Sequence, residues 1–125
     1  FDPSFAGGVR VALADVDGDG TPEVVAAAGP GGPPTVRVLD ARTGGVRYSF
    51  EAFEPSFRGG LFVAAGDFNG DGVPDLVVTP DEGGGPRVKV VSGTDGTTVI
   101  ADLLGITDPN FRGGARAAVG DVNGD

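Results

Sequence analysis

The chain repeats itself with a period of 52 to 54 residues, and this repeat constrains its fold more than any other feature. Residues 1–44 match residues 53–96 at 20 of 44 positions, and residues 107–125 match residues 53–71 at 11 of 19. Repeats of this length are typical of solenoids and propellers, in which each unit packs on its neighbours. We therefore expect two complete units at 1–52 and 53–106, followed by the start of a third unit at 107–125.

Within each period, apolar residues alternate with polar ones, and clusters of Gly, Pro, Asp and Asn separate the alternating stretches. This pattern predicts short strands and no helix. We expect strands at 8–15, 23–28, 35–40 and 46–53, and again at 60–67, 75–79, 87–92 and 98–104. Four short antiparallel strands in about 50 residues are the content of one β-propeller blade, although a sandwich could use the same strands. The predicted fold is all-β, with two complete four-stranded blades and the first strand of a third.

The composition excludes several classes of function. With 24 Gly and 10 Pro the chain would suggest low-complexity disorder if it were aperiodic, but here these residues fall at fixed places in the repeat. The net charge of −9 argues against nucleic acid as a partner, and no apolar run is long enough for membrane insertion. Because the chain has no Cys and no His, any metal must be a hard cation bound by oxygen atoms.

An acidic loop follows the first expected strand of each unit. Residues 15–23 read DVDGDGTPE and residues 67–75 read DFNGDGVPD, with carboxylate or amide side chains at positions 1, 3, 5 and 9. Glycines at positions 4 and 6 allow the left-handed backbone that turns these oxygens inward. The backbone carbonyl of Thr21 or Val73, at position 7, brings each set to five oxygen ligands. This number approaches the six to eight oxygens that Ca²⁺ takes and exceeds the usual protein contribution to Mg²⁺ sites.

Two other interpretations of these loops fit the sequence less well. An EF-hand needs a Glu at position 12 and flanking helices, but position 12 is Ala26 or Val78, inside an apolar strand. Asp-Gly and Asn-Gly are also ordinary hairpin-turn residues. An ordinary turn has no need of four oxygen-bearing side chains at a spacing that recurs in each unit, so calcium is favoured.

The segment 5–12, FAGGVRVA, followed by the loop DVDGDGTPE, resembles the FG-GAP repeat. This repeat is the calcium-binding blade of the integrin α-subunit propeller and is similar to VCBS-like repeats of secreted and surface bacterial proteins. The resemblance covers nearly the whole chain and implies one Ca²⁺ for each complete loop. The implied ligands are Asp15, Asp17, Asp19, Thr21 and Glu23 in the first loop, and Asp67, Asn69, Asp71, Val73 and Asp75 in the second. The third loop contains Asp121, Asn123 and Asp125 and is incomplete as given.

These features predict an extracellular or cell-surface, non-enzymatic module with a structural or adhesive role, stabilised by calcium. We expect it to be a segment of a longer tandem array or of a self-assembling filament, with neighbouring repeats or other copies of itself as partners. An extracellular protein or a glycan is a further candidate partner. The alternative is a carbohydrate-binding domain or the accessory propeller of a secreted enzyme. Half of the 18 acidic residues fall in the loops, and the chain has no Trp and one Tyr, which argues against both catalysis and sugar binding.

Arginines are spread through the repeats without forming a cluster. We interpret them as charges on the blade surfaces or as partners of nearby acidic residues: Arg10, Arg37, Arg47, Arg58, Arg87, Arg112 and Arg116. Exposed ion pairs of this kind contribute little to stability individually.

Overall fold

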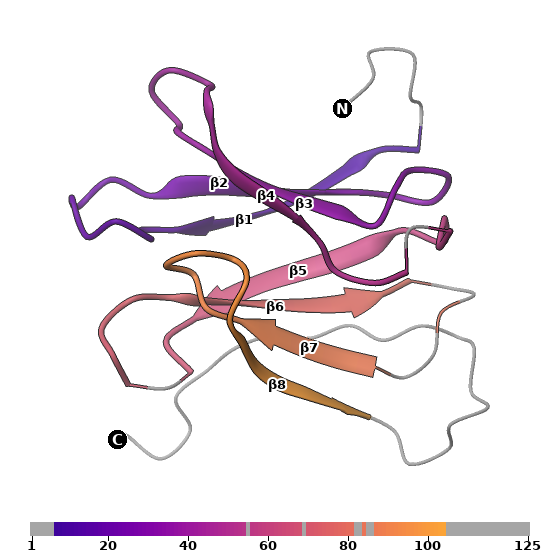
Figure 1. Ribbon diagram of the computed structural model, residues 1–125. Coiled ribbons are helices and arrows are strands. Elements are labelled where there is room, and N and C mark those ends of the chain that lie inside the picture. Colours follow the sequence, from indigo (N-terminus) through magenta and orange to yellow (C-terminus); the bar gives the residue numbers. More distant parts are fainter. Residues whose placement is uncertain (1–6, 55, 69, 82–83, 85–86, 105–125) are drawn as a thin grey trace.

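The computed structural model describes residues 7–54, 56–68, 70–81, 84 and 87–104, and in this part of the chain it contains eight strands and no helix. Four strands form the first sheet, which we call blade 1: β1 (Val9–Ala14), β2 (Glu23–Ala28), β3 (Thr35–Leu39) and β4 (Val46–Glu51). Four more form blade 2: β5 (Leu61–Gly66), β6 (Asp75–Pro80), β7 (Arg87–Val91) and β8 (Val99–Leu104). Each blade is an antiparallel meander in sequence order, and the two lie one above the other (Figure 1). The all-β prediction is confirmed.

The strands lie within a few residues of their predicted positions. Pairing of Ala14 with Glu23 closes the first acidic loop, and pairing of Gly66 with Asp75 closes the second. The acidic loops are therefore the β1–β2 and β5–β6 connections. β4 ends at Glu51, two residues earlier than predicted, and the buried Ala52 then donates its backbone N–H to the carbonyl of Pro34. The expected third unit, 107–125, lies outside the described residues.

The hydrophobic core lies between the two blades. Alternate residues of β1, such as Ala12 and Ala14, face blade 2, and Leu61 of β5 is fully buried in the same core. Small residues on β1 allow the two blades to approach closely where β1 runs beside β5 (Figure 1). The buried members of the core are Ala14, Val16, Val25, Ala27, Val36, Val38, Ala52, Leu61, Leu76, Val78 and Val91.

The two blades pack head to tail, so each uses a different face of the same repeat. In blade 2, Leu61 is fully buried toward blade 1. Its counterpart in blade 1 is Val9, and the apolar row to which Val9 belongs is turned away from blade 2 and is 50 to 64% exposed. That row consists of Val9, Val11 and Leu13, which correspond to Leu61, Val63 and Ala65. Blade 1 thus presents to solvent the same type of face that blade 2 buries.

A turn of blade 2 seals the interface near the acidic loops. The hydroxyl of Tyr48 on β4 donates a hydrogen bond to the carbonyl of Gly93, in the β7–β8 turn. Gly93 also lies against Val16 of the first acidic loop, which is 7% exposed, whereas Phe68 at the same position of the second loop is 53% exposed. A Cβ atom on Gly93 would overlap the carbonyl oxygen of Pro74, so this close approach requires glycine. The first acidic loop therefore depends on blade 2 for its packing.

Arg10 connects the blades at the opposite end of the strands. Its guanidinium forms an ion pair with the largely buried Asp81 at 2.7 Å and donates to the carbonyl of Leu61 at 3.1 Å. It also lies 4.0 Å from the centre of the Phe62 ring, within the range of a cation–π interaction. Arg10 is therefore an inter-blade contact rather than only a surface charge.

We expect Tyr48→Phe to lower the free energy of unfolding by about 1 kcal/mol at neutral pH, because the hydrogen bond to Gly93 is lost. Burial raises the pKa of Tyr48 from 10.0 to about 12. Since this pKa is higher in the folded state, the stability that the phenol contributes is complete below pH 10 and is lost as the pH rises toward 12. Denaturant titrations between pH 7 and 12 should show a shallower alkaline decline in the variant. Equal slopes in the two proteins would contradict the buried phenol.

Candidate metal centre

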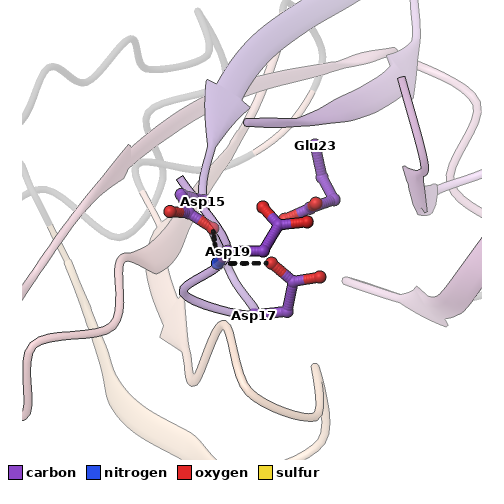
Figure 2. Close-up of side chains that lie close together, drawn as sticks. All are labelled: Asp15, Asp17, Asp19 and Glu23. Atoms are coloured by element: carbon purple, nitrogen blue, oxygen red, sulfur yellow. Dashed lines mark hydrogen bonds between the residues drawn. The ribbon is translucent and has the colours of Figure 1, made fainter. Parts of the chain in front are cut away.

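The β1–β2 loop brings four carboxylates together. Asp15, Asp17, Asp19 and Glu23 each offer an oxygen, and these oxygens all lie within 4.8 Å of one another. Figure 2 shows the four side chains close together around the loop, with Glu23 at the start of β2. The structure thus gathers the four acidic residues that the sequence predicts for the first site.

Backbone amides hold the first loop in this shape. The N–H of Asp19 donates to Asp15 and to Asp17, each at 3.1 Å (Figure 2), and the N–H of Gly20 donates to the other oxygen of Asp15 at 2.8 Å. Gly18 and Gly20 have φ angles of +74° and +85°, the left-handed conformation predicted for positions 4 and 6. The amide of Gly20 is the main reason why the pKa of Asp15 lies below its usual value.

The last carboxylate of each loop is buried beneath it. Glu23 accepts the N–H of Val16 at 2.8 Å, and Asp75 accepts the N–H of Phe68 at the same distance. Asp75 is fully buried and also accepts the N–H of Gly93 at 3.4 Å. Position 9 therefore combines a place in the acidic cluster with a structural hydrogen bond to position 2.

The second loop repeats the arrangement of the first. Oxygens of Asp67, Asp71 and Asp75 lie within 4.8 Å of one another. Asp67 accepts the N–H groups of Gly70 and Gly72, both at 2.8 Å, and these glycines again have positive φ angles. Asn69, the predicted ligand at position 3, lies outside the described residues, as do Asp121, Asn123 and Asp125 of the third loop.

Thr21 and Val73 provide the two predicted carbonyl ligands, and each residue is held in place by a hydrogen bond from its own backbone N–H. The N–H of Thr21 donates to Asp19 at 2.8 Å, and the N–H of Val73 donates to Asp71 at 2.9 Å. Each position 7 is thereby fixed to the carboxylate at position 5 of its loop.

Two arginines beside the first loop were not assigned to it by the sequence. Arg42 forms an ion pair with Asp19 at 2.8 Å, and Arg47 forms one with Asp17 at 3.1 Å. Both arginines come from the β3–β4 hairpin, more than 20 residues away along the chain. Arg47 is among the arginines expected to be blade-surface charges or partners of nearby acidic residues, and the second of these roles is the one it has. The sequence gives no separate signal for Arg42. A charge pattern could not have paired them with particular carboxylates.

The groups gathered in the loops fit a hard cation. The side chains that converge offer only oxygen, without a nitrogen or sulfur ligand among them. In the first loop, positive guanidinium groups already lie against two of the carboxylates, which is the charge that a cation would supply. Oxygen-only sets of several carboxylates suit Ca²⁺ rather than zinc or copper.

We expect Asp75→Asn to lower the free energy of unfolding by about 2 kcal/mol even in excess chelator. Asp75 accepts two backbone N–H groups in a buried position, and the amide of Asn would turn an N–H₂ group toward one of them. The exposed Asp71→Asn, which keeps an oxygen to accept the N–H of Val73, should change the metal-free stability by less than about 0.5 kcal/mol. Denaturant unfolding of both variants tests this difference. Equal losses would show that Asp75 has no separate structural role.

The chain matches the family model of FG-GAP-like repeats over residues 15–78, which is just over half of its 125 residues, and that of the FG-GAP repeat over residues 59–99. No curated protein and no solved structure matches it. The two matches span both acidic loops and strands β2 to β7. Repeats of this family form β-propeller blades, in agreement with the two antiparallel sheets of four strands. The chain belongs to the FG-GAP-like repeat family.

Proposed function

We propose that this chain is a calcium-stabilised structural repeat module without catalytic activity, which works outside the cell. The observation that carries the proposal is the convergence of carboxylate oxygens within 4.8 Å in two separate loops. Like charges at this separation repel each other, and a divalent cation bound between them would attract each carboxylate. Membership of a family of repeat modules supports a structural role.

Each loop would hold one Ca²⁺ through the side chains at positions 1, 3, 5 and 9 and the carbonyl at position 7. In the first loop these are Asp15, Asp17, Asp19, Glu23 and Thr21, and in the second they are Asp67, Asn69, Asp71, Asp75 and Val73. The ion would tie the end of the first strand of a blade to the start of the second strand. Two ions would also bring the formal net charge from −9 to −5.

An extracellular location follows from the calcium proposal. Extracellular modules commonly bind Ca²⁺ with dissociation constants of about 10⁻⁴ to 10⁻³ M, a concentration that is not reached in the cytosol. Many exported domains rely on disulfides for rigidity, whereas this chain has no Cys. Calcium would provide the equivalent cross-link within each blade.

The absence of catalysis is supported by the uses to which the carboxylates are put. Asp15 and Asp67 are each bound by amides of their own loop, and Glu23 and Asp75 are buried under the loops. A hydrolase would need a pair of carboxylates facing a substrate cleft. The carboxylates in these loops face one another instead.

The partner that best fits the free faces is another blade of the same kind. Blade 1 exposes the apolar row of Val9, Val11 and Leu13, which corresponds to the row that blade 2 buries against blade 1. On the corresponding face of blade 2, Leu103 is 49% exposed and is the counterpart of Phe50. Val77 and Val90 of that face are buried, so the exposed part lies along β8. The exposed row of β1 and the exposed residue of β8 are therefore of complementary types. In a longer array a neighbouring repeat would cover them, and in the isolated chain a second copy would do so.

We expect removal of Ca²⁺ to lower the melting temperature strongly. A site that is saturated at 100 times its dissociation constant adds about 2.7 kcal/mol to the free energy of unfolding. For domains between about 60 and 250 residues, each 1 kcal/mol shifts the melting temperature by about 2 to 8 °C. Calorimetry in excess Ca²⁺ and in excess chelator measures the shift, and Asp19→Ala and Asp71→Ala should each remove part of it. An unchanged melting curve in chelator would refute a stabilising role for calcium.

The proposed pairing of the exposed faces can be tested by a complementation experiment. Wild-type chains should associate head to tail at high concentration in Ca²⁺. Val11→Glu and Leu103→Glu should each weaken this association by about 100-fold or more, because an unpaired charge would be buried at one of the two faces.

An equimolar mixture of the two variants should still form dimers, since each retains one intact face. Sedimentation velocity distinguishes these states. A wild-type chain that stays monomeric at millimolar concentration, or a mixture that does not pair, would contradict the proposal.

A further inference from the structure

We propose that Arg42 and Arg47 act as internal counter-ions that compete with the cation for the first acidic loop, so that the second loop fills at a lower calcium concentration. This inference rests on the calcium binding proposed above. It concerns the order in which the two sites fill, which the shared family pattern does not determine. The hairpin beside the first loop carries two arginines that the matching hairpin of blade 2 lacks.

The two arginines contact ligands at positions 3 and 5 of the first loop. Arg42 lies 2.8 Å from Oδ2 of Asp19, and Arg47 lies 3.1 Å from Oδ2 of Asp17. The Oδ1 atoms of the same two carboxylates accept backbone N–H groups of the loop. A cation that binds both Oδ2 atoms must therefore replace two guanidinium groups.

Blade 2 has no cation at the corresponding positions. The β3–β4 and β7–β8 hairpins have matching strand pairs, and the positions of Arg42 and Arg47 are taken by Thr94 and Ile100. The whole hairpin segment 92–100 contains neither Lys nor Arg. The contrast therefore lies in the sequence of the two hairpins and in the two ion pairs of blade 1.

Charge counting gives the order of filling. The first loop carries four carboxylates, and two arginines reduce its charge from −4 to −2. The second loop has Asn69 in place of one carboxylate and carries −3. Calcium affinity rises with the negative charge of the ligand set. The second loop should therefore bind more tightly in the wild-type chain, although the first loop has more carboxylates.

Once displaced, the two arginines can contact other groups nearby. Asp40 lies in the same hairpin, and the charges of Arg42 and Arg47 are among the causes that lower its pKa, after the backbone N–H groups of Arg42 and Thr43. Arg47 also lines a cleft of about 450 Å³ together with Val16, Tyr48 and Thr94. Replacement of the arginines by a cation therefore does not require them to be buried.

The size of the effect follows from the exposure of the ion pairs. Both arginines are partly exposed, and an exposed ion pair changes an equilibrium by no more than about fivefold. Together the two pairs should weaken calcium binding at the first loop by about tenfold. This is sufficient to separate the two sites in a titration.

Calorimetric titration with CaCl₂ tests the inference in single-site proteins. Asp71→Ala leaves only the first loop, and Asp19→Ala leaves only the second. We expect the first loop alone to bind Ca²⁺ more weakly than the second loop alone. Adding Arg42→Gln and Arg47→Gln to Asp71→Ala should then raise the affinity of the first loop about tenfold and reverse the order. Arg58→Gln, at the opposite end of the strands, is the matched control and should change neither site.

The outcomes separate this inference from the calcium proposal itself. If neither single-site protein takes up Ca²⁺ at millimolar concentration, the proposed function fails. If both bind but the arginine substitutions leave the affinity of the first loop unchanged, the counter-ion inference fails and the calcium proposal stands. Circular dichroism of each variant in chelator confirms that its sheets remain folded. A tenfold gain confined to the first loop supports the inference.

Discussion

The repulsion between carboxylates held within 4.8 Å is the constraint on which the rest of the structure depends. Backbone N–H groups offset part of it, since Asp15 and Asp67 each accept amides from glycines with positive φ angles. In the first loop Arg42 and Arg47 offset more. These contacts hold the oxygens in a converging arrangement, which is the arrangement that a calcium ion would bind.

The acidic loops and the blade interface are one connected region. Gly93, in a turn of blade 2, accepts the hydroxyl of Tyr48, donates to Asp75 and lies against Val16. Its neighbours thus include the second acidic loop, the first acidic loop and the last strand of blade 1. A cation that fixed either acidic loop would also restrict the β7–β8 turn that contains Gly93. Cation binding and blade packing should therefore support each other, in keeping with the structural role proposed above.

Much of this arrangement could be predicted from the sequence because it is local. Alternating apolar residues and Gly-rich turns indicated the strands, and the spacing of Asp15, Asp17, Asp19 and Glu23 indicated their convergence, since all four lie in one nine-residue loop. The contacts between distant segments could not be predicted in this way. The pairing of Arg42 with Asp19 joins residues 23 positions apart, and the approach of Gly93 to Tyr48 depends on how two blades stack. Periodicity indicates which face of a strand is apolar, but not what covers it.

A crystal structure of the chain grown with CaCl₂ tests the central claim most directly. The account predicts one ion in each of the two complete loops, with oxygens of positions 1, 3, 5, 7 and 9 at about 2.3 to 2.6 Å from it. In the first loop, Arg42 and Arg47 should have moved away from Asp19 and Asp17. Loops that contain only water, with both arginines still paired to the carboxylates, would contradict the account.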